Sequence, residues 1–232
     1  MKLKVHQLGE GGRTAVLVHG IMSSHGTWVR VAPLLAERGY RVLMPDLRGH
    51  GDSPHAEEYT PELFAADLVE SLPAGADVIV GHSLGGLALS LAVADLRPAR
   101  AVYSDPAWKI GGDAEAAVPI ERFARFTKVA TADQIRRMAP RWVDVDVASE
   151  LDGFARWDVN AAGWLGAAHD RVPDAPAVPS LVVAADDKRL VPDGLAGELR
   201  AKGFEVKVVP GTGHVVHRDD LDGFMAALDG WI

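Results

Sequence analysis

Short runs of apolar, mostly β-branched residues alternate along the chain with longer segments of helical periodicity. The short runs end at glycine, proline, serine or aspartate, as buried strands of a parallel sheet do. Strands are therefore expected at 14–18, 41–44, 77–80, 101–103, 181–185 and 205–209, with a possible antiparallel edge strand at 3–8. Helices are expected at 28–38, 60–72, 84–96, 195–202 and 221–228. This alternation predicts an α/β fold with a doubly wound, mostly parallel sheet.

One long stretch lacks the strand pattern. Between residues 106 and 178 the chain shows helix-like pieces at 120–129, 132–138, 147–157 and 161–168, and it holds four of the six tryptophans. A helical insertion between two strands of an open sheet usually covers the carboxyl edge of the sheet, where ligands bind. We therefore expect a core at 1–105 and 179–232 and a helical cap at 106–178. The alternative is a second small helical core in which the tryptophans only pack.

Composition narrows the class of protein. The 232 residues include 24 Lys and Arg against 32 Asp and Glu, a net charge of −8, which argues against a nucleic-acid partner because such proteins normally present a basic patch. No apolar run of 18 residues and no apolar signal core occurs, so no membrane partner is expected. The chain has no cysteine, which fits a cytoplasmic protein and means that covalent catalysis must use another nucleophile.

Ser83 is the candidate nucleophile. Segment 81–86 reads Gly-His-Ser-Leu-Gly-Gly and lies between a predicted strand and a predicted helix, the context that a G-x-S-x-G motif requires. A sharp strand-to-helix turn holds the central residue in a strained conformation, and small neighbours let the flanking chain approach closely. The serine oxygen is then exposed above the sheet, where the amides at the helix N-terminus also point.

With this motif the chain resembles the α/β-hydrolase family over most of its length. Segment 19–21, His-Gly-Ile, resembles the family's H-G-x motif, and the resemblance implies an oxyanion hole formed by the backbone N–H groups of Ile21 and Leu84. Segment 46–53 reads Asp-Leu-Arg-Gly-His-Gly-Asp-Ser and resembles the family's D-x-R-G-x-G-x-S loop. That loop is a structural brace in the family, so Asp46, Arg48 and His50 are expected to be non-catalytic.

A serine hydroxyl needs a base to remove its proton, and imidazole suits this task because its pKa lies near neutrality. Gly213-His214 follows the last predicted strand and resembles the family's G-H near the C-terminus, which implies that His214 is the general base. His217, three residues later, is the alternative base. His19 is expected to form hydrogen bonds within its own loop.

The acid that should orient the base is less sharply defined. The family's usual G-x-x-D-x-x-V-P pattern, laid over 185–192, places the acid on Lys188, which cannot serve, although one insertion would bring Asp187 into place. A minority of the family carries the acid one strand earlier, directly after the strand that follows the nucleophile helix. Asp105 occupies that position without an insertion. We favour Asp105 over Asp187, with Asp186 as the third choice.

Four side chains are expected at the substrate pocket: His25, Trp28, His82 and Trp108. His25 could line the pocket or cap a helix, and the sequence favours neither. His82 flanks the serine but faces the wrong way to be its base, so it is expected to contact the cap or a neighbouring loop. No H-E-x-x-H motif or comparable ligand cluster occurs along the sequence, so neither a metal site nor a cofactor is expected.

These features predict a serine hydrolase that acts on a small-molecule ester, thioester or lactone through an acyl-serine. A lyase or carbon–carbon bond hydrolase with the same triad is the alternative, and a non-catalytic ligand-binding protein is the third possibility. The aromatic cap favours an apolar substrate group. Five cap arginines could bind a substrate carboxylate, although such residues more often form a solvated helix face: Arg122, Arg125, Arg136, Arg137 and Arg141. The substrate and the oligomeric state are not readable from the sequence.

Overall fold

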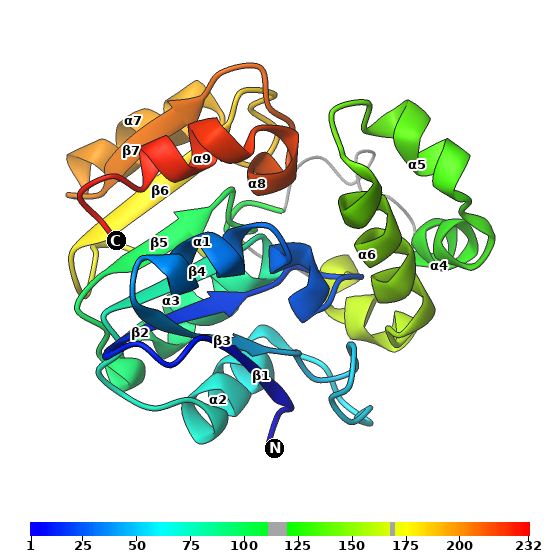
Figure 1. Cartoon of the computed structure of the whole chain (residues 1–232), viewed down its shortest axis with the longest axis horizontal. Coiled ribbons are helices and arrows are strands. Elements are labelled where there is room, and N and C mark those ends of the chain that lie inside the picture. Colours follow the sequence, from blue (N-terminus) through cyan, green and yellow to red (C-terminus); the bar gives the residue numbers. More distant parts are fainter. Residues whose placement is uncertain (111–119, 168–169) are drawn as a thin grey trace.

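A single sheet organises the chain in the computed structural model, which describes residues 1–110, 120–167 and 170–232 (Figure 1). Its strand order is β1-β3-β2-β4-β5-β6-β7, and neighbouring strands are parallel except for β1, which runs antiparallel to β3. The strands are β1 (Val5–Leu8), β2 (Arg13–Val18), β3 (Tyr40–Pro45), β4 (Val78–His82), β5 (Ala101–Ser104), β6 (Ser180–Ala185) and β7 (Glu205–Val209). The predicted fold class is confirmed, including the antiparallel edge strand.

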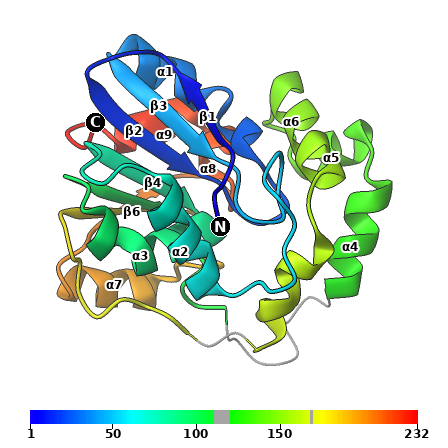
Figure 2. The same ribbon diagram turned by 90° about the horizontal axis from the view of Figure 1, so that it is seen from below.

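Helices cover both faces of the sheet, and each face buries its own apolar cluster. α1 (Val31–Glu37) and α9 (Leu221–Ala227) pack on one face, while α2 (Pro61–Ser71), α3 (Leu84–Leu96) and α7 (Asp193–Ala201) pack on the other (Figures 1 and 2). The central strands are apolar on both faces and fully buried, as a doubly covered parallel sheet requires.

Local sequence signals set several helix ends. Thr60 caps α2 by accepting the Leu63 N–H at 3.2 Å, and Pro61 stands at the first helical position, as its fixed φ favours. α3 has the predicted bounds and is apolar nearly all round, because it is buried against the sheet. The short helix α8 (Val216–Asp219), between β7 and α9, was not predicted, since a single turn has no periodicity to reveal it.

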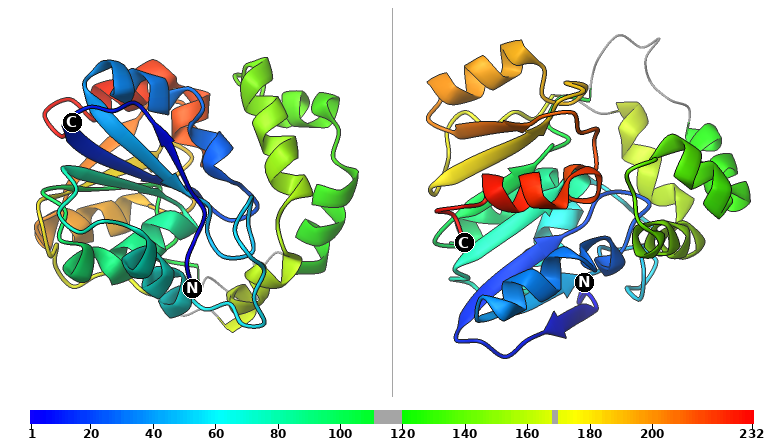
Figure 3. Two further views of the ribbon diagram at one scale, coloured as in Figure 1. Left: turned by 60° about the horizontal axis from the view of Figure 1, so that its bottom comes forward. Right: turned by 45° about the horizontal axis from the view of Figure 1, so that its top comes forward.

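Most of the predicted cap is helical. α4 (Ile120–Val129) and α5 (Ala132–Met138) have the predicted bounds, and α6 (Asp144–Ala155) begins three residues before the predicted start at 147. These helices stand to one side of the sheet and share a small apolar cluster of their own around Ile135, Val147 and Phe154 (Figure 3).

The segment predicted as a helix at 161–168 is a 3₁₀ helix, η2 (Val159–Ala167), and its last predicted residue lies outside the described residues. Just before it, Asp158 donates its N–H to Gly49 O at 2.7 Å, which joins this segment to the core. Residues 111–119 also belong to the predicted cap and lie outside the described residues. The cap limits 106 and 178 therefore stay a prediction.

Segment 46–53 braces the core, as expected. The Arg48 guanidinium donates to both carboxylate oxygens of Asp67 on α2, at 2.6 and 2.8 Å, and the Asp67 side chain is fully buried. His50 Nδ1 lies 2.8 Å from Arg48 O, while His50 Nε2 accepts the Met22 N–H at 3.3 Å. The brace thus supports the turn after β2.

Buried histidines should make the fold sensitive to acid. Burial lowers the pKa of His50 to about 3 and holds the pKa values of His19, His82 and His217 below the usual one. The unfolded chain would bind these protons below about pH 6.5, whereas the folded chain resists them. The free energy of unfolding should therefore fall as the pH drops below 6.5, by about 1.4 kcal/mol per pH unit for each such histidine.

Urea titrations at pH 7.0 and 5.0 measure this loss, which we expect to exceed about 2 kcal/mol. The variant His50→Gln should show a smaller pH dependence, because one buried imidazole is gone. The control His55→Gln removes a histidine whose side chain is 66% exposed and should leave the pH dependence unchanged. Equal unfolding free energies at the two pH values would contradict the expectation.

Candidate active site

Ser83 occupies the turn between β4 and α3 in a backbone conformation that is unusual for a residue other than glycine. Its φ and ψ are 53° and −117°. A Cβ at Gly81 would lie 2.5 Å from Gly85 O, and one at Gly85 would lie 2.5 Å from His19 O. These approaches explain the two glycines of the motif, because any side chain there would push the turn apart.

Two backbone N–H groups are available close to Ser83. Leu84 is the first residue of α3, so its N–H has no acceptor within the helix. Ile21 lies in the turn after β2, and a Cβ at the preceding Gly20 would be 3.1 Å from Ser83 Cβ, which places this turn against the serine. Among the described residues neither N–H has a hydrogen-bond partner. Both can therefore receive a developing negative charge.

The sheet register brings Asp105 to the same edge as Ser83. His82 on β4 pairs with Ser104 on β5, so the next residues, Ser83 and Asp105, leave neighbouring strands together. The Ser83 N–H donates to Ser104 O at 3.0 Å, and the Asp105 carboxylate is fully buried. The predicted nucleophile and the favoured acid thus emerge side by side at the carboxyl edge.

His214 contacts that acid directly. Its Nδ1 lies 2.7 Å from Asp105 Oδ2, while Asp105 Oδ1 accepts the Ala185 N–H at 3.3 Å. A proton on Nδ1 that is held by the carboxylate leaves Nε2 as the basic nitrogen. In the described part of the chain no hydrogen bond joins Ser83 Oγ to His214, and such bonds commonly tighten only when substrate is bound.

The alternative acids have other partners. Asp187 accepts the Arg189 backbone N–H at 3.2 Å and the Arg189 guanidinium at 2.9 Å, and Asp186 accepts the Gly211 N–H at 2.7 Å. Lys188, which the family pattern would align with the acid, binds Asp193 at 2.8 Å. Within the described residues none of these groups bonds to the His214 imidazole.

The neighbouring histidines support the loop that carries His214. His82 Nε2 lies 3.0 Å from His214 O, so His82 contacts a neighbouring loop, one of the two contacts expected for it. His217, the alternative base, is almost fully buried, with Nε2 2.9 Å from Thr27 Oγ1 and its ring stacked on Trp28 at 4.2 Å. Burial keeps the pKa of His217 well below its usual range, which makes it a weak base.

Three of the expected pocket residues have other surroundings. Trp28 and Trp108 are fully buried in the two clusters on opposite faces of the sheet, where burial of their large apolar rings stabilises the core. The Trp108 indole donates to Ser90 Oγ at 3.0 Å. His25 begins η1 (His25–Trp28), whose cap is Ser24, and its Nδ1 lies 3.0 Å from Asp46 Oδ1. None of the three lines the cleft described next.

A cleft of about 430 Å³ lies between the α4–α6 helices and the loops after β6 and β7. His214 is part of its wall, whereas Ser83 is not, so the cleft adjoins the base side of the site. Arg141, one of the five cap arginines, lines it and donates to Gly211 O at 2.7 Å. Its wall includes the large apolar side chains of Phe126, Ile135, Met138, Trp142, Phe154 and Val215.

Asp219 of α8 links the α4–α6 helices to the loop of His214, a role that sequence reasoning missed. Its Oδ2 accepts the Gly213 N–H at 2.6 Å, next to His214, and its Oδ1 accepts the Trp142 indole N–H at 2.8 Å. The adjacent Arg218 is buried and binds Glu150 of α6 at 2.5 Å. The position of His214 is therefore tied to that of α6.

If Asp219 positions the base, Asp219→Ala should lower kcat by roughly tenfold or more, because a small displacement of a catalytic group is costly. KM should change less than kcat, since both oxygens of the Asp219 carboxylate are already bound to Gly213 and Trp142. Initial rates with an ester substrate measure both constants. The control Asp222→Asn alters an exposed acid on α9 and should match the wild type; a purely structural role for Asp219 would lower the folded fraction and leave kcat per folded molecule unchanged.

Comparisons with known proteins show the family of the chain. A model described as "Alpha/beta hydrolase family" matches residues 15–227. The sn-1-specific diacylglycerol lipase ABHD11 of Mus musculus is 27% identical over 253 aligned positions, which cover 94% of this chain and 80% of the lipase.

Solved structures share the fold. An N-formylmaleamic acid deformylase from Pseudomonas putida S16 superposes with a TM-score of 0.81 at 24% identity, covering 97% of this chain and 94% of the deformylase. An N-acyl homoserine lactone degrading enzyme superposes with a TM-score of 0.74 at 21% identity, covering 99% and 96%. In the part of the chain that the structure describes, no helix has the length and apolar character needed to cross a membrane.

Proposed function

Because this chain belongs to the alpha/beta hydrolase family, we propose that it is a serine hydrolase that cleaves a small ester, thioester or lactone. Its relatives are hydrolases, which supports the general class. The observation that carries the proposal is the 2.7 Å contact between His214 Nδ1 and the buried Asp105 carboxylate, at the sheet edge where Ser83 also emerges. A base with an oriented imidazole is what a serine nucleophile requires.

In the proposed reaction, Ser83 Oγ attacks the substrate carbonyl while His214 Nε2 takes the hydroxyl proton. Asp105 holds the Nδ1–H and stabilises the imidazolium that forms. The electron pair of the carbonyl moves onto its oxygen, which the N–H groups of Ile21 and Leu84 bind. When the tetrahedral intermediate collapses, His214 gives its proton to the leaving oxygen or sulfur, and an acyl-serine remains.

Water then completes the cycle. His214 removes a proton from a water molecule, whose oxygen attacks the acyl carbon, and the Ser83 oxygen leaves with that proton. These steps need no group beyond the chain itself and water. The apolar wall of the cleft beside His214 supports an apolar acyl or alcohol group as the preferred substrate part.

Labelling with a fluorophosphonate tests the nucleophile, and a panel of p-nitrophenyl esters of increasing chain length, with a set of lactones, tests the reaction. We expect one covalent adduct per chain, on Ser83, and turnover of at least one ester or lactone. Turnover of an ester or lactone without a covalent adduct on Ser83 would contradict the acyl-serine step. Failure to react with both the fluorophosphonate and the panel would overturn the proposal.

A further inference from the structure

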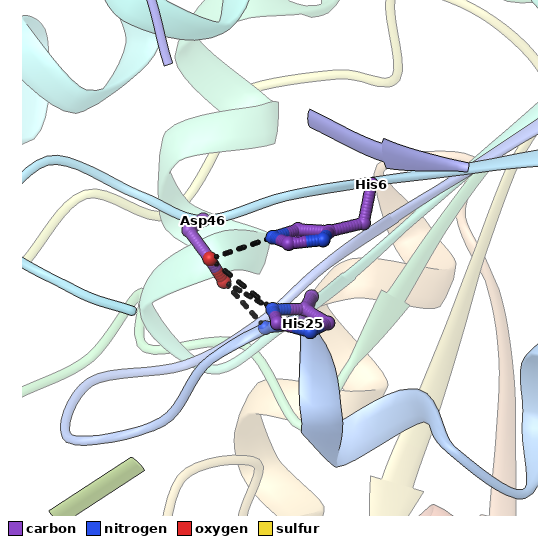
Figure 4. A group of neighbouring side chains, drawn as sticks. All are labelled: His6, His25 and Asp46. Carbon is purple, nitrogen blue, oxygen red and sulfur yellow. Dashed lines mark hydrogen bonds and ion pairs between the residues drawn. The ribbon is translucent and has the colours of Figure 1, made fainter. Parts of the chain in front are cut away.

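Two histidines and an aspartate meet beside the edge strand β1, and none of them belongs to the proposed triad (Figure 4). His6 comes from β1, His25 from η1, and Asp46 follows the end of β3. His6 Nε2 lies 3.1 Å from Asp46 Oδ2, and His25 Nδ1 lies 3.0 Å from Asp46 Oδ1. One ligand atom from each residue thus falls within 4.8 Å of the others.

A second carboxylate lies beside the cluster, next to His6. Asp52 Oδ2 lies 3.4 Å from His6 Nε2, and the Asp52 side chain is about half exposed. Its other oxygen, Oδ1, accepts the Arg156 guanidinium at 2.7 Å, so Oδ2 remains free to bind another group. The side chains of His6 and His25 are 22% and 26% exposed, which leaves the cluster open to an ion from solvent.

We propose that His6, His25, Asp46 and Asp52 bind a divalent first-row transition ion such as Zn²⁺. Zinc–nitrogen and zinc–oxygen bonds of about 2.0–2.1 Å in a tetrahedral site require neighbouring ligand atoms about 3.3–3.4 Å apart. The three nitrogen–oxygen separations of 3.0, 3.1 and 3.4 Å lie close to that spacing. Rotation of both imidazoles and of the Asp52 side chain would have to bring the remaining ligand atoms to the same spacing.

The donor set also selects the kind of ion. Two imidazoles with two carboxylates suit zinc and its neighbours in the first row, whereas Mg²⁺ and Ca²⁺ favour oxygen ligands alone. Two carboxylates can also balance the charge of a divalent ion.

Binding would replace protons by the ion. In the structure each imidazole nitrogen that faces Asp46 lies at hydrogen-bond distance, and the two rings stack at 3.5 Å between centroids with an angle of 17°. The ion requires both nitrogens to be free of their protons, which pass to water, and both rings to turn so that their lone pairs converge. The four bonds would tie β1 and η1 to the 46–53 brace, which is a structural role and leaves the reaction of Ser83 unchanged.

Equilibrium dialysis of the metal-stripped protein against Zn²⁺, followed by elemental analysis, tests the site. We expect one ion per chain. Co²⁺ in place of Zn²⁺ should give the intense visible absorption of a four-coordinate site. At an ion concentration about one hundred times the Kd, the Tm should rise by roughly 5–10 °C.

Matched variants assign the ion to this cluster. His6→Gln should abolish the tight site, the cobalt absorption and the Tm shift, and Asp52→Asn should weaken all three. The control His55→Gln alters another histidine beside a carboxylate, 3.5 Å from Asp158, and should behave as the wild type. No bound ion in the wild type, or equal binding by wild type and His6→Gln, would overturn the proposal. Ester turnover does not enter these readouts, so they are independent of the proposed function.

Discussion

Replacing Ser83 by alanine should lower kcat by roughly 10⁴-fold or more, the largest effect that we expect from any single substitution. The hydroxyl supplies the atom that forms the acyl-enzyme, and nothing adjacent can take its place. Alanine carries the same Cβ at φ 53°, so the strained backbone of the turn is no worse than with serine. The turn and the sheet should therefore remain intact.

Steady-state rates and fluorophosphonate labelling, each compared with the wild type, measure this effect. Ser83→Ala should keep its Tm within a few degrees and should take up no label. Ser180→Ala is the matched control, because Ser180 is a buried serine at the start of β6, far along the strand from the reactive edge. Residual activity of Ser83→Ala above a tenth of the wild-type value would rule out the serine as the nucleophile.

Asp105→Asn should lower kcat by roughly 10³- to 10⁴-fold. Asparagine can still accept the Ala185 N–H, so the local fold should persist. With the amide oxygen on the Ala185 N–H, the amide NH2 group faces His214 Nδ1 and can only donate to it. This arrangement favours the other tautomer of the imidazole. Nε2 would then carry the proton and could not act as the base.

Asp187→Asn is the matched control for this substitution. Asp187 also lines the cleft beside His214, but its carboxylate is bound to Arg189. We expect its kcat to stay within threefold of the wild-type value. The kcat values of the two variants should be compared at saturating substrate and across pH 6 to 9. Near-normal turnover by Asp105→Asn, together with a large loss in Asp187→Asn, would assign the role of the acid to Asp187 instead.

The sequence pattern alone could not decide whether Asp105 or Asp187 is the acid that contacts His214. Along the sequence, Asp105 and Asp187 each follow an apolar strand, and each could serve a histidine at the same sheet edge. The family pattern, when it is laid over residues 185–192, even places Lys188 in the position of the acid. What distinguishes them is side-chain direction: Asp105 leaves β5 with φ 40° and reaches His214, whereas Asp187 turns to Arg189.

The location of the tryptophans is a second feature that the sequence pattern could not predict. The tryptophans near the predicted site suggested a pocket, but Trp28 and Trp108 are buried on opposite faces of the sheet. A large apolar side chain gains free energy from burial in either place, so its residue type alone cannot say which. α8 and the role of Asp219 were missed for a related reason, because one helical turn that is held by tertiary contacts leaves no periodic signal.

The sequence by itself determined the strands, most of the helices and the strand–turn–helix around Ser83. These follow from local rules: the period of apolar residues, the N-cap at Thr60 and the close approaches that demand glycine. Only the tertiary structure decided which acid meets His214 and which residues join His6. Those partners lie 109 residues apart in the first case and 40 in the case of His6 and Asp46. Strand order and register bring them together, and neither is encoded in any single segment.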